Sequence, residues 1–141
     1  MSVDPAFAPD ETAAILAGVE RWAAAIPELR LTTTVAACQT PAPDEVCLHP
    51  AHQPPDPADD VVGSTYPGSA DDSTVLIYVD RIRATGWDFG ILTEQTTAHE
   101  IGHAIGLRHS HPGTLMAADV PDQAHTVTAD DVAQFWAVRG K

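Results

Sequence analysis

The chain has 141 residues, with 20 Asp and Glu residues against 7 Lys and Arg residues and a formal net charge of −13. This length predicts one domain with a proper core, because a chain of about 150 residues buries roughly 70% of its unfolded surface. The negative charge argues against nucleic acids and anionic membranes as partners, since their phosphate groups would be repelled. No apolar run approaches the roughly 18 residues of a membrane span, so we expect a soluble protein.

The first predicted element is a helix that begins at Asp10, a residue suited to cap a helix N-terminus. Apolar residues then recur at helical spacing as far as Ile26, and Pro27 ends the pattern. A strand is predicted next over Leu29 to Ala37, which is rich in Thr and Val.

Six of the twelve prolines lie between Pro41 and Pro57, mixed with aspartates. This composition predicts that residues 41–60 form a Pro/Asp-rich surface loop within the single domain 1–141. Two short strands are predicted after it, over Val61 to Tyr66 and Thr74 to Val79, and we expect them to be neighbours in a sheet.

Two further helices are predicted in the second half of the chain. Thr93 is placed to cap one that runs from Glu94 to a break at Gly106. Thr128 caps the other, whose acidic first turn suits the helix dipole. Helices at both ends with strands between them predict the α+β class.

Cys38 and Cys47 are close enough in sequence to form a disulfide, although two unrelated thiols are an equally good interpretation. No basic segment followed by an apolar core opens the sequence, so no signal peptide is visible. The protein is then either intracellular or a processed form of a secreted one.

The residues that carry chemistry are His99, Glu100, His103, Gly106 and His109, which fill every fixed position of the pattern HExxHxxGxxH. On a helix, His99 and His103 project from one face and reach the same metal ion, and zinc is the usual ion for such a site. Glu100 lies beside the metal rather than on it, where its carboxylate takes a proton from the attacking water.

A straight helix would carry the third histidine, His109, far from the ion. Gly106 resolves this difficulty, because a residue without a Cβ adopts positive φ easily, ends the helix and turns the chain back. Three neutral nitrogens leave one position of tetrahedral zinc open, which is the catalytic arrangement. The competing interpretation is an ordinary amphipathic helix with surface or core histidines, which the full pattern makes a poor one.

This segment resembles the zinc-binding signature of the metzincin metalloproteases, and most closely that of their matrixin branch. Ser110 follows the third histidine as in matrixins, and Leu115-Met116 falls where that family has the Met-turn beneath its zinc. The resemblance implies a metzincin-like zincin fold: a small twisted mixed sheet, an N-terminal helix, an active-site helix and a C-terminal helix. It also implies that Met116 packs under the imidazoles.

The strand over Val61 to Tyr66 and its Pro-Gly turn resemble the matrixin edge strand. The resemblance implies that a peptide substrate binds along it, and the residues expected to contact substrate are Val61, Val62, Gly63 and Ser64. His111 and His125 are near the metal motif in sequence, and each is either a substrate contact or a solvated loop histidine.

Some features depart from the matrixin pattern. The histidines that hold a second, structural zinc in the family are missing, since Gly63 and the run Val75 to Tyr78 stand in those strands, so one catalytic zinc is expected. A calcium ion is a further possible cofactor: Asp71, Asp72 and Asp80 either gather one or are exposed turn carboxylates.

The sequence therefore predicts a monomeric zinc endopeptidase that is secreted or extracytoplasmic and acts on peptide or protein substrates, with no nucleic-acid or membrane partner. Two alternatives share the metal site. One is a noncatalytic zinc-stabilised protein-binding domain, and the other is a narrow-specificity hydrolase with a single partner substrate.

Overall fold

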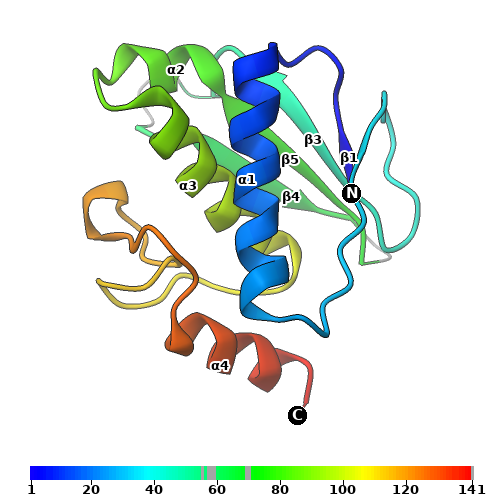
Figure 1. The fold of residues 1–141 in the computed structure, drawn as a ribbon, viewed down its shortest axis with the longest axis vertical. Coiled ribbons are helices and arrows are strands. Elements are labelled where there is room, and N and C mark those ends of the chain that lie inside the picture. Colours follow the sequence, from blue (N-terminus) through cyan, green and yellow to red (C-terminus); the bar gives the residue numbers. More distant parts are fainter. Residues whose placement is uncertain (55, 57–59, 69–70, 141) are drawn as a thin grey trace.

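The computed structural model describes residues 1–54, 56, 60–68 and 71–140 (Figure 1). Its α+β class agrees with the sequence prediction. The strands are β1 (Ser2–Val3), β2 (Thr34–Val35), β3 (Val46–Ala51), β4 (Gly63–Pro67) and β5 (Ser73–Tyr78). The α-helices are α1 (Pro9–Ala25), α2 (Val79–Ala84), α3 (Phe89–Ala104) and α4 (Ala129–Val138), and a short 3-10 helix covers Val120–Asp122.

The five strands form one mixed sheet in the order β2-β1-β3-β5-β4. All neighbouring pairs are parallel except β4 and β5, which pair antiparallel from Gly63 opposite Ile77 to Pro67 opposite Ser73. The predicted neighbour relation of these two strands is confirmed. Because β4 ends the strand order, no strand of the described residues pairs with its outer edge, which is open to another extended chain.

The core lies between the sheet and the two long helices, α1 and α3, which pack against each other in front of the sheet in Figure 1. Trp22 is fully buried between the helices, and its indole Nε1 donates to the carbonyl oxygen of Ala98 at 2.7 Å. Helix α3 also contacts β4 and β5, so its residues face the open edge of the sheet.

The interpretation of residues 41–60 as a surface loop is wrong for its middle part. Val46–Ala51 is β3, which lies at the centre of the sheet between β1 and β5, and Cys47 and Leu48 are fully buried. Residues 55 and 57–59 of this segment lie outside the described part of the chain.

Two of the predicted helix starts are also wrong. Helix α3 begins at Phe89, where the carboxylate of Asp88 accepts from the amide of Ile91, and Thr93 is a buried residue inside the helix. Helix α1 begins at Pro9, and the carboxylate of Glu11, rather than Asp10, accepts from the amide of Ala8. The end of α1 before Pro27 is as predicted.

Strand boundaries differ from the prediction as well. Of the segment Leu29 to Ala37, only Thr34–Val35 pairs in the sheet, with β1, a strand that was not predicted. Val79 does not end β5 but begins α2, which was also not predicted. The cap at Thr128 is confirmed, since its hydroxyl accepts from the amide of Asp131.

Cys38 and Cys47 form a disulfide, which ties the segment after β2 to the buried strand β3. Of the two interpretations of these cysteines, the structure supports the bonded one. None of the described helices is both long and apolar enough to cross a membrane.

Candidate metal centre

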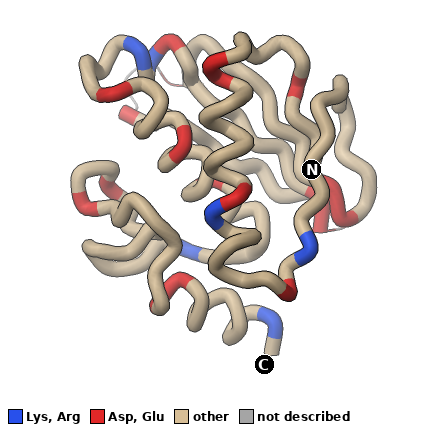
Figure 2. The backbone as a smooth tube through the Cα atoms, in the orientation of Figure 1, with Lys and Arg blue, Asp and Glu red and all other residues tan. Residues whose placement is uncertain are grey.

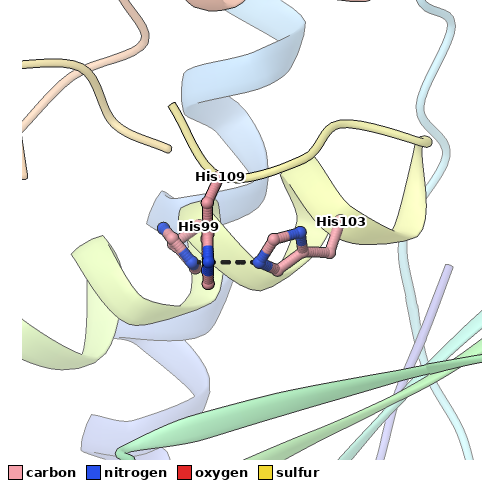
Figure 3. Close-up of side chains that lie close together, drawn as sticks. All are labelled: His99, His103 and His109. Carbon is pink, nitrogen blue, oxygen red and sulfur yellow. Dashed lines mark hydrogen bonds between the residues drawn. The ribbon is translucent and has the colours of Figure 1, made fainter. Parts of the chain in front are cut away.

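Three histidines that the sequence singled out lie together at the end of α3 (Figure 3). His99 and His103 come from the helix, and His109 comes from the chain that follows it. The ring centroid of His103 lies 4.8 Å from that of His99 and 4.8 Å from that of His109, and the centroids of His99 and His109 are 5.3 Å apart. One nitrogen from each ring lies within 4.8 Å of the other two, close enough for one ion to contact all three.

The turn that delivers His109 is centred on Gly106, whose φ is +99°. The amide of Leu107 donates to the carbonyl of Gly102 at 2.9 Å, and the amide of Gly106 donates to the carbonyl of His103 at 3.0 Å. This pair of bonds is the Schellman motif that closes many helices on a glycine. The chain therefore turns where the sequence predicted.

The protonation of two of the rings follows from their partners. The Nδ1 atoms of His99 and His103 each lie 2.9 Å from a backbone carbonyl oxygen, of Leu115 and Leu107 respectively. A carbonyl only accepts, so each Nδ1 carries a proton, and in the neutral form of each ring the lone pair is then on Nε2.

The two Nε2 atoms lie 3.1 Å apart (Figure 3). Two lone pairs at this separation repel each other unless a cation joins them. Burial lowers the pKa of His99 to about 4, so this ring is neutral at pH 7 and free to bind a metal. Three imidazole nitrogens, two of them oriented by backbone carbonyls, are a donor set that fits zinc.

Glu100 lies next to the three histidines and is 6% exposed. Burial raises the pKa of its carboxyl to about 7, against the opposing effect of a hydrogen bond from the hydroxyl of Thr65. A carboxylate with this pKa is matched to accepting and returning a proton near neutral pH.

An open cleft of about 610 Å³ contains this group. The three histidines and Glu100 line it together with the strand β4 and the residues just before it, and with the segment around the short 3-10 helix. Val61, Val62, Gly63 and Ser64, the residues expected to contact substrate, all line the cleft. His111 and His125 do not line it, and the Nε2 of His111 lies 3.2 Å from the carboxylate of Asp130.

A sequence model of the matrixin family matches residues 6–139 of the chain. The chain belongs to the matrixin family. No curated protein sequence matches it. Among solved structures, it is similar to a chain of the GM1-bound form of the ECX AB5 holotoxin, with a TM-score of 0.53 and 13% sequence identity. That likeness covers 99% of this chain and 70% of the other, and it bears on the fold alone.

Met116 is the residue that the resemblance assigns to the Met-turn. Met116 is fully buried, and its Sδ occupies the space that a Cβ on Gly102 would enter, on the helix between the two metal-facing histidines. The preceding carbonyl, of Leu115, is the one that orients His99.

Asp131 holds this turn in place, and sequence reasoning credited it only with a favourable position near the start of α4. Its buried carboxylate accepts from the amides of Leu115 at 3.0 Å and Met116 at 3.2 Å. It also accepts from the amide and the hydroxyl of Thr128. The sequence predicted that Thr128 caps an acidic first turn, but that prediction carries no information about the Met-turn.

Gln123 is a further residue that the sequence did not single out. It lines the cleft, and its amide nitrogen lies 3.0 Å from the carbonyl of Ala117 and 3.1 Å from the Nδ1 of His99. No local sequence pattern distinguishes this glutamine, because its contact with His99 forms only when the segment that carries it folds back over α3.

The other metal ions considered find little support. Within the described residues, Asp71, Asp72 and Asp80 do not form a metal-binding group, and Asp80 pairs with His52 at 2.7 Å instead. The structure gives the calcium prediction no support. A second cluster, of Glu45 with the two cysteines, has its sulfur atoms joined in the disulfide and offers no thiolate.

Proposed function

We propose that this chain is a zinc-dependent endopeptidase, a single catalytic domain over residues 1–141 with a metzincin-like zincin fold. The observation that carries the proposal is the convergence of His99, His103 and His109 beside the buried Glu100 in an open cleft. Membership of the matrixin family supports the same activity.

The three histidines would hold the zinc ion. When bound, zinc supplies Lewis-acid chemistry, since it lowers the pKa of water and polarises a carbonyl group. The carbonyls of Leu115 and Leu107 keep His99 and His103 in orientation, and Met116 packs against Gly102 on the helix between these two histidines.

Glu100 is the general base and then the general acid. Its carboxylate accepts a proton from the water that attacks the scissile carbonyl, and it passes this proton to the leaving amine. The burial that raises its pKa toward 7 suits both transfers, because neither protonation state is then strongly disfavoured near neutral pH.

The peptide substrate binds in an extended conformation along β4. This strand ends the sheet and lines the cleft with Gly63 and Ser64, so a peptide added at its open edge runs past the metal centre. Backbone hydrogen bonds provide binding that is largely independent of side chains, which favours a range of peptide substrates.

We infer a secreted or extracytoplasmic location from the disulfide, because disulfides persist in oxidising compartments. A monomer is the expected state in solution.

The proposal is tested with an unbiased peptide library. The purified protein, loaded with zinc, is expected to cleave peptides in the library, to lose this activity with a chelator and to regain it with zinc. A protein that holds zinc but cleaves none of the peptides would contradict the proposal. That result would favour a noncatalytic binding domain or a hydrolase with one partner substrate.

A further inference from the structure

The open-edge strand β4 contacts the candidate general base directly. The hydroxyl oxygen of Thr65, on β4, lies 2.6 Å from Oε2 of Glu100 and 2.9 Å from the backbone carbonyl oxygen of the same residue. A threonine hydroxyl has one proton and donates to one acceptor at a time. The shorter distance, and the charge of the carboxylate, favour donation to Oε2.

A second residue of β4 fits against the same side chain. A Cβ built on Gly63 would lie 2.8 Å from Cγ of Glu100 and 2.8 Å from Cγ2 of Thr96, distances at which neighbouring atoms must move. Glu100 thus fills the space beside Gly63. Because side chains two residues apart on a strand share a face, Gly63 and Thr65 together form the surface against which the Glu100 side chain lies.

We propose that Thr65 is a positioning residue for Glu100, which it holds in the orientation needed for proton transfer. This inference rests on the proposed peptidase function. A buried glutamate side chain has several rotamers, and a short hydrogen bond to a charged acceptor selects one of them. Thr65 suits this role because its β-branched side chain on a paired strand has few rotamers of its own.

Strand β4 would then both bind the substrate peptide and position Glu100. The open edge of β4 is where a substrate peptide would pair, and its inner face fixes the carboxylate that accepts the proton. Since one strand sets both positions, the distance between the scissile bond and the base is defined by the strand itself rather than by a flexible loop.

Three variants test the role of Thr65. Thr65→Val keeps the shape but removes the donor, Thr65→Ser keeps the donor, and Thr74→Val makes the same change on β5. Thr74 pairs with Tyr66 and so lies on the opposite face of the sheet from Thr65. Each variant is measured for zinc content and for kcat and KM on one peptide.

For Thr65→Val, kcat should fall about 10- to 100-fold with unchanged KM and zinc content, since a bond to a charged group is lost and the base is misplaced. Thr65→Ser should recover most of this loss, and Thr74→Val should match the wild type. An unchanged kcat in Thr65→Val would overturn the inference. An effect confined to KM would assign Thr65 to substrate binding, and failure of the serine variant to recover would assign it a packing role.

Crystal structures of the zinc-loaded wild type and Thr65→Val separate this inference from the proposed function. The Glu100 carboxylate should contact Thr65 in the wild type and be displaced in the variant, whether or not the protein cleaves peptides. If the wild type cleaves nothing, the proposed function fails; if the carboxylate occupies the same position in both structures, the positioning role fails.

Discussion

Replacing Asp131 with Ala should destabilise the protein and weaken zinc binding together. Asp131 lies in the first turn of α4, yet its carboxylate accepts from the amides of Leu115 and Met116, in the turn that follows the three histidines. The carbonyl of Leu115 in turn orients His99. The variant therefore disturbs the support of a metal-facing ring without touching the ring itself.

The magnitude follows from the groups that lose their acceptor. Leu115 and Met116 are fully buried, and a buried amide without a partner costs about 1–3 kcal/mol. Loss of the cap interaction with Thr128 adds about 1 kcal/mol. The two amides and the cap together give about 3–7 kcal/mol, so we expect the free energy of unfolding to fall by at least about 3 kcal/mol, at the upper end for single substitutions. Zinc affinity should fall about 10- to 100-fold, as for other changes in groups that orient metal ligands.

Asp130→Ala is the matched control. Asp130 is the preceding residue in the same helical turn, but it is exposed and, within the described part of the chain, pairs with the exposed His111. Such an exposed pair contributes little to stability, because solvent screens it. Both variants are unfolded with denaturant in the presence of zinc, and zinc affinity is measured by competition with a chromogenic chelator. If Asp131→Ala matches Asp130→Ala within about 1 kcal/mol, the turn does not depend on this carboxylate, and the reasoning is refuted.

Two further predictions concern the disulfide and the charge. Replacing Cys38 and Cys47 together with Ser should lower the free energy of unfolding by about 2.7 kcal/mol, the chain-entropy value for a loop of about ten residues; equal denaturation midpoints for variant and wild type would show that the bond does not stabilise the fold. Acidic residues are spread over the molecule (Figure 2), and Asp60 and Asp119 line the cleft, with no Lys or Arg among its described lining residues. At low ionic strength, acidic peptides should be cleaved more slowly than basic ones of the same length, and added salt should reduce the difference. Equal rates in dilute buffer would mean that the charge does not influence substrate choice.

The candidate metal centre was the most predictable part of the chain because its geometry is local. His99 and His103 are four residues apart on one helix, and a single glycine, Gly106, turns the chain toward His109. These relations depend on backbone geometry over about ten residues, which the spacing of the pattern already specifies.

Strand β3 was not predictable from the sequence, because the many prolines around it are typical of a loop. Its buried part is only Val46, Cys47 and Leu48. Pro50 is tolerated because it lies beyond the end of β1, where β3 has a neighbour on one side only. The segment is a strand because it pairs with β1 and β5, whose residues are far away in sequence. Local residue preferences do not predict such long-range pairing.

Capping residues show a similar limit. Asp88 and Thr93 are both suited to cap a helix, and the sequence does not say which one starts α3. In the folded protein the first turn of α3 contains Phe89, and Thr93 is fully buried inside the helix. Tertiary packing therefore decides where α3 begins. Likewise, the contact of Thr65 with Glu100 joins two elements 35 residues apart, so only the tertiary fold reveals it.

The most direct test of the central claim is the zinc content and turnover of Glu100→Ala beside the wild type. Both proteins should bind one zinc ion per chain, because Glu100 is not expected to be a ligand, while kcat should fall by about 10²- to 10⁴-fold in the variant. A variant that keeps its zinc and cleaves peptides as fast as the wild type would contradict the account, and two zinc ions per chain would contradict the single metal centre.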